Sequence, residues 1–258
     1  MTKKRRARDK LIERLAAPGL AFVVLGFWQA AVPLFGLSEF VLPTPLSIAE
    51  RMVKDFSLLS VQAGYTLYEV LAGFALAVAI GIPLSLGVFY WRSFERAVYP
   101  MLVALQTIPK VALAPLLVLY LGYGWAPKIC LVFLISFFPI VISTVVGLNS
   151  LEKGFVSLVR SMGANEWQTF IKVRLPAALP SVFGGFKVAI SLAVIGAIIG
   201  EYVASSQGLG YVQLQSNARF DTTLNFATVV TISLLGVILY FVISYIESHF
   251  VYQREAAK

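Results

Sequence analysis

Several runs of about 20 mostly apolar residues constrain this chain more than any other feature of its sequence. A helix of that length crosses the roughly 30 Å hydrocarbon core of a membrane. Only 13% of the 258 residues are charged, whereas soluble domains carry about 25%. We therefore expect an all-α polytopic membrane protein, with one transmembrane domain over residues 1–258 and six spans. The spans are expected near residues 17–37, 64–90, 98–122, 129–149, 177–200 and 224–246.

The distribution of Lys and Arg predicts the orientation of these spans. Seven lie in the basic tail 1–16, two in the loop with Arg92 and Arg96, four in the loop 150–176 and two after the last span. The opposite side has only four, which are Arg51, Lys54, Lys128 and Arg219. Because loops rich in Lys and Arg stay in the cytoplasm, both termini and the loop 150–176 are expected there. The net charge of +8 then reflects topology and not a nucleic-acid partner.

Motifs for catalysis and for ATP binding are absent from the sequence. No GxxxxGK[ST] loop occurs, so we expect ATP to be bound by a partner and no cofactor by this chain. No HExxH, GxSxG or Cys/His cluster occurs, so a metal site or an enzyme is not expected. An ion-coupled secondary transporter remains the alternative, although it would need mid-span carboxylates, which the expected spans lack.

Four charged residues in or near the spans are candidates for a translocation pathway. Lys110 and Lys187 fall inside apolar runs, whereas Glu69 and Glu201 lie near span ends on the outer side, where they can reach water. A charge at the centre of a membrane helix costs about 2.5–3.5 kcal/mol. Lys110 should therefore face the bundle interior or a water-filled cavity. A structural ion pair or snorkelling to the membrane surface is the alternative for both lysines.

Prolines and glycines punctuate the apolar runs. Four prolines should kink the spans that contain them, and these are Pro83, Pro109, Pro115 and Pro139. Gly196 and Gly200 form a GxxxG pattern that allows another helix to approach closely. On the outer side, an amphipathic stretch follows Pro45, and a Gly-rich turn, SSQGLGY, lies between Tyr202 and Thr223.

The loop 150–176 encodes two short amphipathic helices. In the first, apolar residues recur with the spacing of one helix face, at Phe155, Leu158, Val159 and Met162. Gly163 then breaks the pattern, and a left-handed backbone is expected there. Asn165 and Gln168 resemble a capping box that starts the second helix.

Trp167, Phe170 and Ile171 form the apolar face of this second helix, and Pro176 and Pro180 are expected to end it and start the fifth span. Three interpretations fit the pair of helices: they rest on lipid headgroups, pack on their own bundle, or dock a cytoplasmic partner.

A resemblance to a known family favours docking. Gly163, Val173 and the pair Leu175–Pro176 resemble the EAA loop of bacterial ABC importer permeases. The stretches QTIPKVALAPLLVLYLGYG, FFPI and GEYVASSQGLGY are similar to the nitrate, sulfonate and taurine branch, and the resemblance runs from about Leu42 to Glu247. Glu69, where many relatives have Arg, is closer to relatives for pyrimidine or flavin vitamin precursors. The Glu-Ala-Ala positions fall on 157–159, so the acidic residue is missing.

The resemblance implies a permease subunit in the inner membrane of a bacterium, which moves a small polar solute by alternating access. Two copies would form the pathway, a periplasmic or lipid-tethered binding protein would deliver solute, and a pair of cytoplasmic ATPases would dock on residues 152–172. The docking residues would be Phe155, Leu158, Val159, Met162, Gly163, Ala164, Trp167, Phe170, Leu175 and Pro176.

Overall fold

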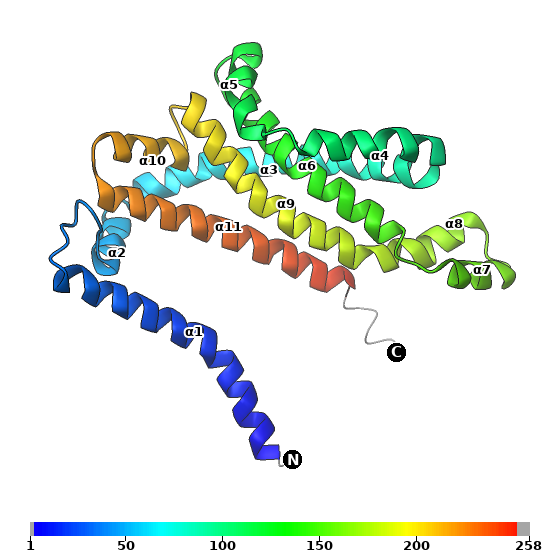
Figure 1. Cartoon of the computed structure of the whole chain (residues 1–258), viewed down its shortest axis with the longest axis horizontal. Helices are drawn as coiled ribbons and strands as arrows, with labels where there is room; N and C mark the ends of the chain where they lie inside the picture. Colours follow the sequence, from blue (N-terminus) through cyan, green and yellow to red (C-terminus); the bar gives the residue numbers. More distant parts are fainter. Residues whose placement is uncertain (1–2, 252–258) are drawn as a thin grey trace. The chain divides into compact units, whose positions relative to one another are not determined.

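Helices alone build the computed structural model over residues 3–251, the part of the chain that the structure describes, and no strand occurs there (Figure 1). This confirms the all-α prediction. The C-terminal basic tail, with Arg254 and Lys258, lies outside the described residues. The helices are α1 Lys3–Leu34, α2 Pro45–Lys54, α3 Phe56–Tyr90, α4 Arg92–Gln106, α5 Lys110–Leu121, α6 Trp125–Leu148, α7 Lys153–Ser161, α8 Glu166–Thr169, the π-helical η1 Phe170–Arg174, α9 Leu175–Ala204, α10 Leu209–Ala218 and α11 Thr222–Val251.

Four long apolar helices could cross a membrane, which are α3, α6, the continuous helix Glu166–Val203 and α11. The first expected span corresponds to a shorter apolar helix, Gly19–Leu34. By length and composition the described residues supply four spans, or five if α4 and α5 form one bent span. The count of six spans therefore remains a prediction.

The span expected over residues 98–122 is not one continuous helix. The structure has α4 and α5 instead, bent by 95° across the break between Gln106 and Lys110. Pro109 has no N–H to donate, and the residue before a proline is pushed out of the helical conformation. Thr107 and Ile108 bond only three residues back, to Ala104 and Leu105. The break thus follows from one proline, which ends the helix where the sequence suggested a kink.

The chain forms two compact units, one from the residues up to Leu59 with Val212–Val230, the other from Ser60–Tyr211 with the residues from Thr231 onward. In the first unit, Thr44 caps α2 by accepting a hydrogen bond from the Ser47 N–H at 3.1 Å. This confirms a helix after Pro45. Arg51 pairs with Asp55 and, at 2.7 Å, with Asp221. Burial opposes the charge of Arg51, but these two carboxylates outweigh it and raise its pKa.

In the second unit, α6 and α9 pack along each other and form the core. The apolar residues that meet there come from α3, α6, α9 and α11 and include Val70, Val132, Ile190, Ala193, Val194, Ala197 and Leu239. A Cβ at Gly196 would lie 3.2 Å from Val132, and one at Gly200 would lie 3.1 Å from Lys128. The GxxxG pattern therefore does allow a close approach, and the helix that approaches is α6.

Candidate functional site

The loop 150–176 contains the two helices that the sequence predicts. α7 spans Lys153–Ser161, and α8 starts at Asn165. The Asn165 side chain accepts a hydrogen bond from the Gln168 N–H at 2.8 Å, and the Gln168 side chain accepts one from the Asn165 N–H at 3.1 Å. This reciprocal pair is a capping box. The sequence therefore fixes where the second helix begins.

Gly163 forms the hinge between the two helices. Its φ angle is +88°, in the left-handed region that favours glycine. The Gly163 N–H donates to the Arg160 carbonyl at 3.0 Å, and the Ala164 N–H donates to the Val159 carbonyl at 3.3 Å. Apart from Gly163 and its two chain neighbours, no described residue has an atom within 4 Å of where a Cβ at this position would lie. The need for glycine there is consequently set by the backbone and not by packing.

Four large apolar side chains on α7, the hinge and α8 are exposed to solvent. They are Phe155, Leu158, Met162 and Trp167, and we call them the α7–α8 surface. Val159, which the sequence placed on the same face, and Ala164, another of the expected docking residues, are partly buried. An ion pair of 2.6 Å between Arg160 and Glu166 spans the hinge. The surface is therefore apolar, left uncovered by the residues that the structure describes, and held at a defined angle.

Phe170 does not lie on this surface, contrary to the expectation from the sequence. Its side chain is only 8% exposed and packs with Leu148, Ala178 and Val182. Its ring is 5.6 Å from that of Tyr90 at the end of α3. Phe170 is the first residue of the π-helical stretch η1, in which a turn contains more residues than in an α-helix. The Phe170 N–H still donates to the Glu166 carbonyl four residues back, so the π-helical turn begins only after this position. Phe170 is buried because residues of the bundle cover its side of the helix.

Pro176 and Pro180 do not end the second amphipathic helix, although the sequence suggested that they would. The chain stays helical from Glu166 to Val203 through η1. Pro176 is in the first turn of α9, where a missing N–H costs little, and Pro180 lies inside the helix. π-helical turns commonly absorb such irregularities in long helices. Leu175 and Pro176 are accordingly half-buried parts of the long helix.

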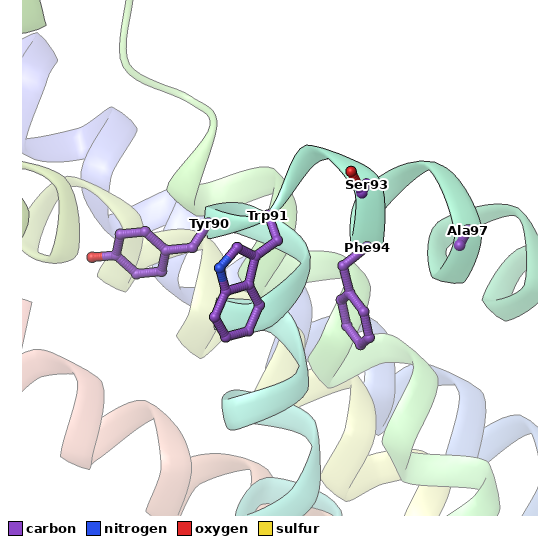
Figure 2. Close-up of a pocket in the computed structure, with 5 residues that line it drawn as sticks. All are labelled: Tyr90, Trp91, Ser93, Phe94 and Ala97. Carbon is purple, nitrogen blue, oxygen red and sulfur yellow. The ribbon is translucent and has the colours of Figure 1, made fainter.

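A hollow lies beside this segment at the corner between α3 and α4. It has a volume of about 580 Å³ and is lined by Tyr90, Trp91, Ser93, Phe94 and Ala97 (Figure 2). Tyr90 lines this hollow and also contacts Phe170. The corner is thereby connected to the helix that carries the α7–α8 surface.

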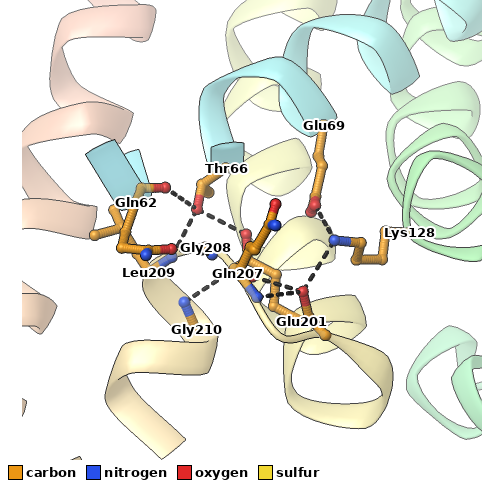
Figure 3. A network of polar contacts seen from close by, with 10 residues as sticks. Gln62, Thr66, Glu69, Lys128, Glu201, Gln207, Gly208, Leu209 and Gly210 are labelled. Carbon is orange, nitrogen blue, oxygen red and sulfur yellow. Dashed lines mark hydrogen bonds and ion pairs between the residues drawn. The ribbon is translucent and has the colours of Figure 1, made fainter. Parts of the chain in front are cut away.

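A buried polar network joins α3, α6 and the end of α9 (Figure 3). Glu69 of α3 pairs with Lys128 of α6, and Lys128 also donates to the Ser205 hydroxyl at 3.0 Å. Glu201 accepts hydrogen bonds from the Thr66 hydroxyl at 2.7 Å and from the Gly210 N–H. Glu69 and Glu201 are fully buried. The expectation that they reach water is wrong, and so is the placement of Lys128 in an outer loop.

The glycines of SSQGLGY wrap the chain around the Glu201 carboxylate. Gly208 has a φ angle of +102°, and a Cβ there would collide with that carboxylate. A Cβ at Gly210 would lie 2.8 Å from Glu201 Oε2. The Gly208 N–H also donates to the Gln62 side chain at 2.6 Å, and the Leu209 N–H donates to Thr66 at 2.9 Å. The sequence indicated a turn here, but not the buried acid that it encloses.

Lys110 lies in a second hollow, as expected for a charge that must avoid lipid. Its Nζ donates to the Gln106 carbonyl at 2.9 Å and lies 4.9 Å from the centre of the Phe138 ring. This hollow has a volume of about 450 Å³. Lys187, in contrast, pairs with Glu247 of α11 and lies 5.8 Å from the ring centre of Tyr240. Lys187 thus has the structural ion pair that the sequence left open as its alternative.

Comparison with known proteins shows the family to which this chain belongs. Residues 73–252 match the family described as binding-protein-dependent transport system inner membrane component. The chain is 38% identical to the formylaminopyrimidine transport permease protein ThiX of Halalkalibacterium halodurans, over 90% of this chain and 93% of that protein. It is also 38% identical to the riboflavin transport system permease protein RibX of Chloroflexus aurantiacus, over 90% of this chain and 88% of that protein.

More distant relatives agree. The putative aliphatic sulfonates transport permease protein SsuC of Bacillus subtilis is 29% identical, over 84% of this chain and 79% of that protein. Among solved structures, an inward-facing form of the MetNI methionine ABC transporter superposes with a TM-score of 0.66 at 20% identity, over 76% of this chain and 97% of that one. At this identity the likeness shows the fold alone.

The chain therefore belongs to the family of inner membrane components of binding-protein-dependent transport systems. It is a transmembrane permease subunit of an ABC importer, as the resemblance of its loop 150–176 implied. Membership in this family removes the ion-coupled secondary transporter as an alternative.

Proposed function

We propose that the α7–α8 surface docks a cytoplasmic ATPase, which binds ATP in place of this chain and drives alternating access through the permease. The observation that carries this proposal is the exposure of Phe155, Leu158, Met162 and Trp167 on two helices fixed by a capping box and a left-handed glycine. Apolar helix faces that fit a groove on a partner are a common mode of recognition.

The connection of this surface to the bundle supports a role in coupling. α8 continues through η1 into α9 without a break in helical structure. Phe170, directly after α8, packs against Leu148 of α6 and near Tyr90 of α3. A displacement of the docked helices would therefore move the cytoplasmic ends of three bundle helices together. Such motion suits a transporter that switches its cavity between the two sides.

We further propose two copies of this permease per transporter, a periplasmic or lipid-tethered binding protein, and cytoplasmic termini in a bacterial inner membrane. The excess of Lys and Arg in the loops on one side supports this orientation. The relatives suggest two groups of solute, sulfonate-like anions and pyrimidine or flavin vitamin precursors. A ligand screen on the cognate binding protein would separate these groups.

The docking proposal is tested by co-purification of the ATPase with permease variants. Trp167 is 69% exposed on the α7–α8 surface, and Trp91 is 67% exposed outside it, so Trp91→Ala is a matched control. Loss of an aromatic anchor from an interface costs about 2 kcal/mol or more. We expect Trp167→Ala to remain in the membrane but to recover much less ATPase than Trp91→Ala. Equal recovery with both variants would contradict docking through this surface.

A further inference from the structure

The hollow around Lys110 has the size and lining of a small-molecule site. Its volume of about 450 Å³ falls in the range of ligand pockets, roughly 300–1,000 Å³. Side chains of α4, α5, α6 and α9 surround it, and they are Gln106, Lys110, Ile135, Phe138, Pro139, Ile142, Ser143 and Leu192. Most of the lining is apolar, with an ammonium, an amide and a hydroxyl as its polar groups.

Lys110 differs from Lys128 and Lys187, the lysines of the long apolar helices α6 and α9. Lys128 pairs with Glu69, and Lys187 pairs with Glu247. Among the side chains that the structure describes, Lys110 has no carboxylate within ion-pair distance. It donates one hydrogen bond, to the Gln106 carbonyl. An ammonium has three N–H groups, so two remain free for the hollow.

An ammonium among the apolar helices of a membrane protein needs a counter-charge or water. Charged residues within membrane helices almost always face a polar interior and pair with another group. The aromatic face of Phe138 attracts a cation but does not neutralise its charge. The fold supplies a carboxylate to Lys128 and to Lys187 and none to Lys110 among the described side chains. The described residues therefore leave this negative charge to be supplied by another group.

We infer that the Lys110 hollow binds the negatively charged group of the transported solute, a sulfonate, carboxylate or phosphate. The inference rests on the proposed function, because a translocation pathway would bring a water-soluble solute to this hollow. It favours sulfonates or acidic precursors over neutral flavins as the solute. Lys110 would hold the oxyanion through its two free N–H groups, while apolar residues such as Ile142 and Leu192 contact the rest of the molecule.

A charged pair of thiol reagents tests this inference without knowledge of the solute. Gln106→Cys places a thiol on the wall of the hollow, and the Gln106 backbone carbonyl that bonds Lys110 is unchanged. The background carries Cys130→Ala, since Cys130 is the only native cysteine. The reagents are 2-sulfonatoethyl methanethiosulfonate, which is negative, and 2-(trimethylammonio)ethyl methanethiosulfonate, which is positive. The rate of the negative reagent is divided by that of the positive reagent, and this ratio is compared with the same ratio for a small free thiol in solution. A higher ratio at position 106 indicates that the hollow is positively charged.

We expect the negative reagent to be favoured by about tenfold, because charged clefts concentrate counter-ions by at least that factor. Lys110→Gln should remove the preference, and Lys110→Arg should keep it. Lys187→Gln is the matched control, and it should leave the ratio unchanged because Lys187 is already paired. Failure of both reagents to react, or a preference that persists in Lys110→Gln, would overturn the inference.

Lipid headgroups are the other source of such an anion. The same rates are therefore measured in nanodiscs of phosphatidylcholine with and without phosphatidylglycerol. If the reaction rates do not depend on the anionic lipid, they support binding of a soluble solute. If the anionic lipid slows the negative reagent, its headgroup occupies the hollow, and the hollow is a lipid site instead. Recovery of ATPase with the same variants reports the proposed docking separately, because positions 106 and 110 lie outside the α7–α8 surface.

Discussion

Lys128 and Glu69 form an ion pair inside the second unit, where both side chains are buried. They come from α6 and α3, and Ser205 at the end of α9 shares the Lys128 ammonium. Removal of one partner of a buried pair leaves an uncompensated charge and costs about 3–5 kcal/mol, whereas replacement of both by apolar residues is often neutral. The pair thus ties three helices together at one end of this unit.

We predict that Lys128→Met destabilises the permease strongly and that Glu69→Leu together with Lys128→Met recovers most of the loss. The single variant leaves the Glu69 carboxylate buried without its cation, and the double variant removes both charges. Thermal unfolding in detergent, followed by intrinsic fluorescence, measures the difference. A single variant as stable as the wild type would show that water reaches Glu69.

Gly163→Val should weaken the hold on the ATPase, and Gly163→Asn should not. A β-branched residue is strained at a φ angle of +88°, whereas Asn visits the left-handed region at little cost. The strain, about 1–2 kcal/mol, would turn α7 away from its angle to α8. Co-purification and the ratio of ATP hydrolysis to uptake measure the effect. Full recovery of ATPase and normal uptake in Gly163→Val would contradict the claim that the backbone conformation of Gly163 is needed for docking.

Lys110→Ala should leave membrane insertion and ATPase recovery intact and change the kinetics of uptake. The reason is that Lys110 faces a hollow and holds no other helix through an ion pair among the described residues. Lys187→Ala, by contrast, frees Glu247 of α11 and should lower thermal stability. Initial rates of uptake in membrane vesicles, normalised to permease content, compare the two. If Lys110→Ala takes up solute with wild-type kinetics, Lys110 has no role in transport.

Single cysteines should place position 163 in the cytoplasm and positions near Pro45 and Gly208 outside. The Lys and Arg bias predicts this orientation, and the Cys130→Ala background makes each new thiol unique. A membrane-impermeant maleimide applied to intact spheroplasts should label only the outer positions. Labelling of position 163 from outside would contradict the predicted orientation of all the spans.

Local patterns in the sequence predicted the local structure correctly. The capping box at Asn165 and the left-handed Gly163 each depend on a few adjacent residues, and the structure confirms both. The two short helices of the loop 150–176 follow from the same rules. In these places backbone geometry is determined by residues that are neighbours in the chain.

Contacts between distant residues could not be predicted in this way. Glu69 and Lys128 are 59 positions apart, and Thr66 and Glu201 are 135 positions apart. No periodicity links such distant residues. The charges of Glu69 and Glu201 therefore suggested exposure to water, whereas the fold buries both carboxylates beside polar partners. The exposure of Phe170 was predicted wrongly for the same reason, because Leu148 of α6 and Tyr90 of α3, which contact it, are distant in the sequence.

The continuous helix from Glu166 to Val203 also limits how the length of this chain can change. Each residue in an α-helix turns the next by about 100°, so one insertion between Trp167 and the core of α9 would rotate Trp167 to another face. The segment between α1 and α2 has no such constraint and can absorb extra residues. We therefore expect insertions to be accepted around residues 36–43 and rejected in η1, whatever residue type is inserted.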